Sequence, residues 1–405
     1  MKTLQIETVC KPRVVIIADD FTGALDTGVK LATHGALVSV AQYAMFDLHV
    51  EADVLVINAE CRHLTRDEAY NRIRSLTEAV FSVPYVYIKT DSALRGQIGA
   101  YITAAMDALG VTVVPFAPAY PDMGRIMRDG RQYIDGKPLC DSCFAKDPLN
   151  PVNIDKTAEL FTEEEVSVFV VPSGSIIPTI CQREIVLFDA ENNDDMFFAA
   201  NNVYKAGMLR LTAGCAGFAS VLAGKYGFNC KKNLLNKCIT PLLVFCGSIN
   251  SVTTDQIQFG SENGFKVVFL PSVESGSDKY WEKDLRNDLD NGQNLIITTA
   301  SIQSNETNPI SLGMQLQKIG GRLLLDVLSK PEAERYTTLV VGGDTLVGFM
   351  REAGFPHVVI QGEVLPGVVK FTMLLDGKER SFLSKSGGFG SKTLLVDLLK
   401  GKDER

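Results

Sequence analysis

The sequence predicts an α/β protein of two domains, each built on a mostly parallel β-sheet with helices on both faces. Short, continuously apolar segments alternate with amphipathic helical segments along most of the 405 residues, which is typical of parallel strands covered on both sides. A polar, basic stretch at 227–240 interrupts this alternation. It is the expected linker and candidate hinge, and it divides the chain into domains of residues 1–236 and 237–405.

The N-terminal domain is expected to repeat strand, turn and helix. Strands are predicted at 13–18, 53–58, 85–88, 111–116, 166–171, 184–188 and 209–211, and helices at 24–34, 65–81, 96–109 and 215–226. Thr22 is the expected N-cap of the first helix. Residues 118–153, which are rich in Pro, Gly, Asp and Arg, are expected to form a long ordered loop.

The C-terminal domain is expected to place three glycine turns directly between a strand and a helix. Strands are predicted at 241–245, 266–270, 294–298, 337–341 and 379–383, and helices from 252, at 312–328, after 345 and at 393–400. The turns contain Gly247-Ser248, Gly342-Gly343 and Gly387-Gly388. Glycine lets backbone N–H groups approach an anion, and ligands gather beyond the carboxyl ends of parallel strands. The three turns are therefore expected to converge on one polyphosphate.

Composition and missing motifs disfavour several other classes of protein. The net charge of −8 argues against a nucleic-acid or anionic-membrane partner. We find no signal peptide and no apolar run long enough to span a membrane. The cysteines are scattered along the chain, which is typical of reduced thiols, so a cytoplasmic protein is expected. The patterns GxxxxGK[ST] and GxGxxG are absent, which disfavours a P-loop and a dinucleotide-binding dehydrogenase.

Charged side chains cluster where predicted N-terminal strands end. Asp19 and Asp20 follow the first strand, and a second cluster with Lys89 and Asp91 follows the third. Helix capping and an internal Lys–Asp ion pair are the structural alternatives to a catalytic role. Arg125, in the Pro/Gly-rich segment, is either an anion contact or a surface residue.

Seven motifs in order carry a resemblance to a known family: ADDFTGALDTG, KTDSALRG, PAYPDMGR, GSINSVTTDQ, GGDT, GEVLPGV and KSGGFG. Over residues 18–390 the chain resembles the four-carbon acid sugar kinase family. The resemblance implies an N-terminal acid-sugar-binding domain, a C-terminal nucleotide-binding domain and an active site in the cleft between them. It also implies ATP and Mg²⁺ as cofactors, and transfer of phosphate to the terminal hydroxyl of threonate, erythronate or a 3-oxo-tetronate.

The motifs, together with the chemistry of phosphoryl transfer, suggest roles for residues of this chain. Asp20 is the first candidate for the general base and Asp91 the second. The residues expected at the sugar acid are Asp19, Lys89, Ser92, Arg95 and Arg125, with Arg95 on the substrate carboxylate. The residues expected at the nucleotide are Ser248, Gly342, Gly343, Asp344, Thr345, Ser386, Gly387 and Gly388.

Several features stay open at the level of the sequence. No metal ligand is assigned, although Asp344 is a candidate through a water molecule. Ala93 and Ile126-Met127 depart from the family pattern, so the particular tetronate and its stereochemistry are undetermined. A kinase of another small hydroxy acid and a non-catalytic sensor of nucleotide or sugar acid are the alternative functions. A homodimer is among the oligomeric states that the sequence leaves open.

Overall fold

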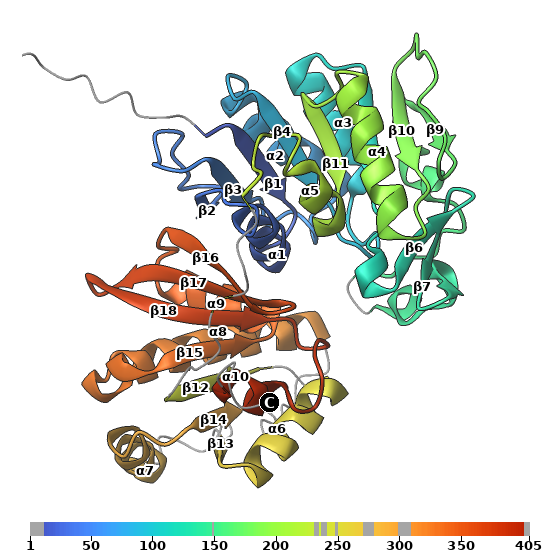
Figure 1. Cartoon of the computed structure of the whole chain (residues 1–405). Coiled ribbons are helices and arrows are strands. Elements are labelled where there is room, and N and C mark those ends of the chain that lie inside the picture. Colours follow the sequence, from blue (N-terminus) through green and yellow to red (C-terminus); the bar gives the residue numbers. More distant parts are fainter. Residues whose placement is uncertain are drawn as a thin grey trace, which may run out of the picture. The chain divides into compact units, whose positions relative to one another are not determined.

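The computed structural model describes residues 12–147, 150–230, 235, 241–247, 250–269, 279–298 and 309–400 (Figure 1). The chain forms two compact units, residues 1–232 and 233–405. Each unit contains its own set of strands and helices. The predicted fold class, two α/β units with mostly parallel sheets, is confirmed. Most of the proposed hinge, at 231–234 and 236–240, lies outside the described residues.

The sheet of the N-terminal unit is parallel throughout. In spatial order its strands are β2 (Val38–Gln42), β3 (Val54–Asn58), β1 (Val14–Ala18), β4 (Tyr85–Lys89), β11 (Leu211–Gly214), β5 (Val113–Ala117), β10 (Glu184–Phe188) and β9 (Ser167–Val171). The central strands are buried along nearly their whole length, as their continuous apolar sequences predict. Strand β2 was not predicted, because Ser39 and Gln42 interrupt its apolar sequence.

Helices cover both faces of this sheet. They are α1 (Phe21–Ala32), α2 (Arg66–Ala79), α3 (Ile98–Leu109), α4 (Asn193–Lys205) and α5 (Ala216–Leu222). Helix α1 packs against α5, and α2 packs against α3 (Figure 1). Because right-handed crossovers that run in opposite directions along a sheet fall on opposite faces, these two pairs form the two outer layers.

The prediction for residues 118–153 is wrong, because they contain regular structure. Strands β6 (Arg125–Arg128), β7 (Arg131–Ile134) and β8 (Lys137–Pro138) form a small antiparallel sheet. Both connections are Asp-Gly dipeptides, Asp129-Gly130 and Asp135-Gly136, in which every residue has a positive φ. Asp-Gly favours such two-residue hairpin turns, so the sequence carried a local signal for this sheet.

The sheet of the C-terminal unit is parallel at one end and antiparallel at the other. Its strands in spatial order are β13 (Lys266–Phe269), β14 (Leu295–Thr298), β12 (Leu242–Cys246), β15 (Thr337–Val341), β18 (Lys378–Lys385), β17 (Val368–Leu375) and β16 (Val358–Leu365). Strands β16, β17 and β18 form an antiparallel meander, of which the sequence predicted only β18.

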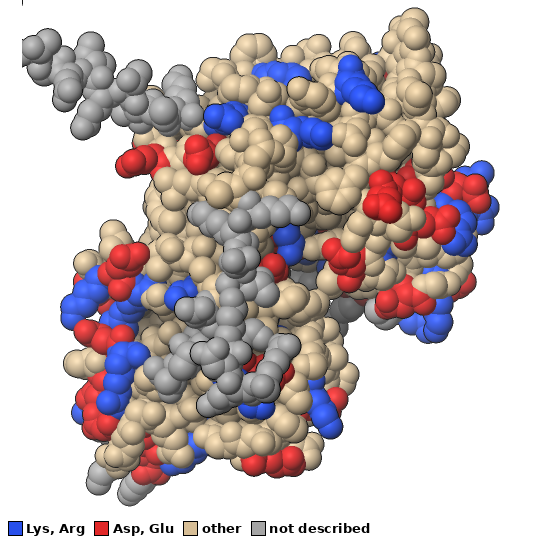
Figure 2. Space-filling model, in the orientation of Figure 1, with Lys and Arg blue, Asp and Glu red and all other residues tan. Residues whose placement is uncertain are grey.

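The helices of this unit again lie on two faces. They are α6 (Ser251–Glu262), α7 (Lys279–Asp290), α8 (Pro309–Leu328), α9 (Gly343–Glu352) and α10 (Leu394–Leu399). Helices α6 and α10 cover a core that includes Leu383 and Leu394, whereas α8 packs against α9 on the opposite face. Among the residues described, no helix has the length and apolar character needed to cross a membrane. On the face that Figure 2 shows, acidic and basic side chains are interspersed.

Candidate active site

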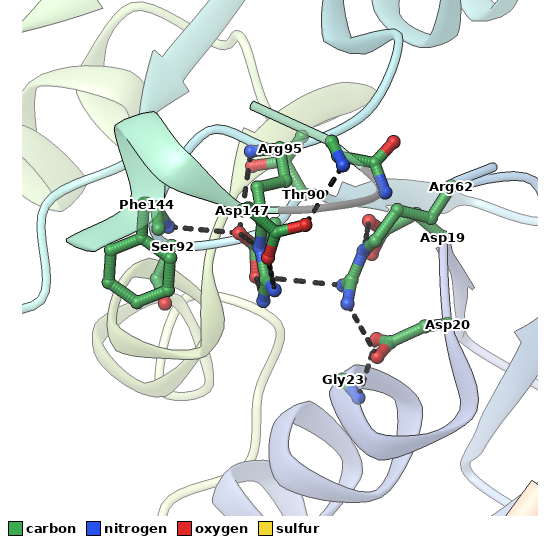
Figure 3. Close-up of polar contacts among 12 residues, drawn as sticks. Asp19, Asp20, Gly23, Arg62, Thr90, Ser92, Arg95, Phe144 and Asp147 are labelled. Carbon is green, nitrogen blue, oxygen red and sulfur yellow. Dashed lines mark hydrogen bonds and ion pairs between the residues drawn. The ribbon is translucent and has the colours of Figure 1, made fainter. Parts of the chain in front are cut away.

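The polar cluster of the N-terminal unit gathers at the carboxyl ends of three adjacent strands. Strand β1 lies between β3 and β4, so the residues that follow these strands become neighbours. Asp19 and Asp20 follow β1, and Arg62 lies in the loop after β3 (Figure 3). Asp91 follows β4. This is the edge at which parallel α/β sheets bind their ligands.

Asp20 joins this cluster as the N-cap of α1. The helix begins at Phe21, and Asp20 Oδ1 accepts a hydrogen bond from the Gly23 amide at 2.8 Å. The prediction that Thr22 caps the helix is therefore wrong. Thr22 already lies in the first turn, whereas the short Asp20 side chain reaches the third amide from an extended backbone. The cap fixes the Asp20 carboxylate at the positive end of the helix dipole.

Arg62 holds three carboxylates together and was not predicted from the sequence. Its guanidinium donates to Asp19 Oδ2 at 2.7 Å and to Asp20 Oδ2 at 2.8 Å, and it lies 3.6 Å from Asp91 Oδ1. The Arg62 side chain is only 10% exposed, so water screens these contacts little. The three carboxylates hold the pKa of Arg62 well above its usual value despite its burial.

Asp91 is the most strongly ion-paired acid of the cluster. It accepts two hydrogen bonds from Arg95, at 2.8 Å and 3.1 Å, in a bidentate pair. Burial alone would raise the pKa of Asp91, but Arg62 and Arg95 outweigh it and the pKa is lowered. Arg95 also donates to Asp147 at 3.1 Å, so Asp91 and Asp147 share its guanidinium.

Asp19 and Lys89 occupy the most enclosed part of the cluster. Burial is the largest effect on Asp19 and raises its pKa, although Arg62 opposes the shift. The Lys89 ammonium is buried and donates to the Thr90 carbonyl at 2.8 Å. A Cβ placed on Gly23 would lie 2.7 Å from Lys89 Nζ and 2.5 Å from Asp20 Oδ1. Glycine at position 23 therefore lets the ammonium and the carboxylate approach the same point of α1.

The segment 118–153 contributes the other wall of the cluster. Arg125 donates to Ser92 Oγ, and Gln132 of β7 donates to the Ser92 carbonyl. The ring of Phe144 lies 5.2 Å from the Arg95 guanidinium and 5.6 Å from that of Arg125. Gln132, Phe144 and Asp147 were not predicted, because only the tertiary fold of this segment brings them to β4.

Several buried polar atoms at this site have no hydrogen-bond partner within the described parts of the chain. They are Asp19 Oδ1, Thr90 Oγ1, Arg125 Nε and Gln132 Oε1. Buried polar atoms are rarely left unsatisfied, and a small ligand with several hydroxyl groups and a carboxylate would supply the missing partners. The arrangement is therefore suited to a polyhydroxy acid.

In the C-terminal unit the three glycine turns lie in contact with one another. Gly342, the N-cap residue of α9 with φ 103°, donates its N–H to the Lys385 carbonyl at 3.1 Å. A Cβ on Gly247 would lie 2.1 Å from Thr345 Oγ1 at the start of α9. Thr253 of α6 donates to the Gly387 carbonyl at 2.6 Å. The described parts of the turns after β12, β15 and β18 therefore lie next to one another.

One feature of these turns differs from the prediction, and one predicted residue lies outside the described part of the chain. The Gly387-Gly388 turn does not lead directly into a helix, because α10 begins only at Leu394. Gln256 of α6 holds the intervening segment by donating to the carbonyls of Phe389 and Ser391. Ser248 lies outside the described residues. Gly343, Asp344 and Thr345 form the first turn of α9, and Asp344 Oδ1 accepts from Gln317 at 2.9 Å.

Within the described residues, no group of three or more His, Cys, Asp or Glu side chains could hold a metal ion. Mg²⁺ in phosphotransferases is usually bound by one or two carboxylates together with substrate phosphates, and it keeps several waters. The exposed carboxylate of Asp344, beside the backbone amides of the turns, fits that mode of binding.

Comparison with known proteins agrees with this two-part arrangement. A family model described as a sugar-binding N-terminal domain matches residues 14–222, and one described as a nucleotide-binding C-terminal domain matches residues 243–395. The chain is 28% identical to the D-threonate kinase of Salmonella typhimurium, over 96% of this chain and 97% of that protein. It is 29% identical to the D-erythronate kinase of Heliobacterium modesticaldum, over 63% of this chain and 62% of that protein.

The fold also has a solved counterpart. The crystal structure of protein HI1011 from Haemophilus influenzae superposes with a TM-score of 0.72 at 18% identity, over 95% of this chain and 98% of that chain. At this identity the likeness shows the fold alone. The family models span both units, and the seven sequence motifs lie in the same two units. The chain therefore belongs to the four-carbon acid sugar kinase family.

Proposed function

We propose that this protein is an ATP-dependent kinase that phosphorylates the terminal hydroxyl of a four-carbon sugar acid: threonate, erythronate or a 3-oxo-tetronate. The named relatives are kinases, which supports a phosphotransferase. One observation carries the proposal. A buried acid–guanidinium cluster with unpartnered polar atoms lies in the unit matched by the sugar-binding model, and three contiguous glycine turns lie in the unit matched by the nucleotide-binding model.

Asp20 is the proposed general base. The acceptor hydroxyl must be oriented toward the γ-phosphate and must lose its proton as the new P–O bond forms. The Asp20 side chain is 27% exposed, and the Gly23 amide and Arg62 fix the carboxylate. The carboxylate is thus accessible and oriented, which are the two requirements of the role.

Asp91 is less suited to accept that proton. Two guanidinium groups lower its pKa, and a carboxylate that strongly favours the ionised form is a weak base. We assign Asp91 a positioning role, in which it keeps Arg62 and Arg95 in place beside the substrate.

Arg125 is the proposed ligand of the substrate carboxylate, together with Arg95. Arg95 already donates to Asp91 and Asp147, whereas Arg125 Nε is buried and has no partner among the residues described. A substrate carboxylate that accepts from Arg125 Nε would satisfy this atom. Asp19, Lys89 and Ser92 would complete the contacts to the hydroxyl groups and to the developing charge.

The glycine turns are the proposed nucleotide site. Backbone amides of Gly342 to Thr345 and of Ser386 to Gly388 would donate to phosphate oxygens, and Ser248 is expected beside them. Bound Mg²⁺ would neutralise phosphate charge, with Asp344 as its protein ligand. The acid and nucleotide sites must meet during transfer, and excluding water then prevents hydrolysis of ATP.

A panel assay tests the proposal. ADP release is measured with ATP and each of the D- and L-tetronates, their 3-oxo forms and other small hydroxy acids. Release with a tetronate in preference to the other acids is the expected result. Preference for another hydroxy acid would change the substrate class. ATP binding without ADP release for any acid would support the non-catalytic sensor and overturn the kinase.

A further inference from the structure

Lys385 is a buried cation for which neither the fold nor the proposed chemistry above gives a role. It is the last residue of β18 and is only 3% exposed. Its ammonium group has no hydrogen-bond partner among the residues that the structure describes. An unpaired ammonium in the interior is costly, and such groups are rare unless a ligand or a reaction needs them.

The position of Lys385 places its side chain among the three glycine turns. Cys246, Val341 and Lys385 are the last residues of β12, β15 and β18, and strand pairing sets them side by side in one row. Each is followed by one of the turns. Side chains in one row of a parallel sheet point to the same face, and here it is the face that α6 and α10 cover.

The surroundings of the ammonium group follow from the same row of residues. Cys246 lies two strands away, a backbone distance of about 10 Å. The Lys385 side chain is buried at the end of the sheet from which the turns at Gly247 and Gly342 begin. Burial lowers the pKa of Lys385 to about 8, so the free protein provides little to stabilise its charge.

We infer that the Lys385 ammonium binds the terminal phosphate groups of the nucleotide, an inference that rests on the kinase function proposed above. The turns supply neutral N–H donors to the phosphates, whereas Lys385 supplies the only buried unpartnered lysine charge beneath them in the described residues. A phosphate oxygen would give the ammonium both the hydrogen bond and the opposite charge that it lacks. Because AMP lacks these terminal phosphate groups, the inferred contact distinguishes ATP and ADP from AMP.

Nucleotide titration of the full-length protein tests this inference. Calorimetry is used to measure binding of ATP, ADP and AMP to the wild-type protein, Lys385→Met and Lys385→Arg. Lys378→Met is the matched control, because Lys378 begins the same strand, is exposed and pairs with Glu334 at the surface. Loss of one charge-assisted hydrogen bond should weaken ATP and ADP binding by about 10- to 100-fold in Lys385→Met. AMP binding should be unchanged there, Lys385→Arg should retain part of the affinity, and Lys378→Met should match the wild type.

The outcomes separate the inference from the proposed function. If Lys385→Met binds ATP and ADP like the wild type, or loses AMP binding to the same extent, the phosphate role of Lys385 is overturned while the kinase proposal stands. If the wild-type protein binds no nucleotide, both are overturned. Circular dichroism confirms that each variant is folded.

Discussion

Replacing Lys385 by methionine should stabilise the C-terminal unit at neutral pH, although most substitutions of buried residues destabilise. Methionine has a similar length, carries no charge and packs well in an apolar interior. In the folded protein burial lowers the Lys385 pKa from its ordinary 10.5 to about 8. This difference corresponds to a cost of about 3 kcal/mol for keeping the lysine charged in the folded state at neutral pH, and the variant should regain most of it.

The pH dependence of the gain follows from the same shift. Below about pH 8 the lysine is protonated in both folded and unfolded states, so the full cost applies. Between about pH 8 and 10.5 the unfolded chain binds the proton that the folded protein has released, and the stability of the wild type rises with pH relative to the variant. The advantage of the methionine variant should therefore shrink through this range.

Urea unfolding followed by tryptophan fluorescence measures this difference. The single tryptophan of the chain, Trp281, lies in α7, so its signal reports the C-terminal unit. The midpoint of Lys385→Met should exceed that of the wild type at neutral pH and approach it in alkaline buffer. A variant that is less stable than the wild type, or a difference that does not change with pH, would refute the reasoning.

Three further predictions concern the N-terminal unit. Asp20→Asn should lower kcat by about 10²- to 10⁴-fold while α1 stays capped, because asparagine also caps helices. A kcat near the wild-type value in steady-state kinetics would exclude Asp20 as the base. Arg62→Met should destabilise the unit by about 3–5 kcal/mol, since it leaves buried Asp19 without its guanidinium partner. This loss, measured by chemical denaturation, should be larger at neutral pH than in mild acid. In mild acid buried Asp19 takes up a proton on folding, because its pKa is raised, and the neutral side chain no longer needs the Arg62 charge. Arg125→Gln should raise the KM for the acid with little change in the KM for ATP, whereas Arg128→Gln, on the exposed end of the same strand, should change neither.

Local sequence was sufficient for most strands of the parallel sheets. Continuous apolar runs such as 14–18 and 337–341 became buried strands, and the charged residues that end β1 and β4 took part in one cluster. Prediction was weaker where a local signal was overlooked or absent. The Asp-Gly dipeptides between β6, β7 and β8 are a local signal for hairpin turns. Strand β2, in contrast, carries polar residues that a buried parallel strand does not usually show.

The sequence by itself determined the two α/β units, the glycine turns and most of the charged residues of the candidate site, because periodicity and turn chemistry are local properties. Only the tertiary structure decided which of these residues meet. Strand β1 lies between β3 and β4, and this order brings Arg62 to carboxylates 42 and 43 residues earlier in the chain. Strand register likewise set Lys385 in one row with Cys246 and enclosed its charge without a partner among the described residues. Such contacts depend on sheet order and register, which are properties of the whole fold.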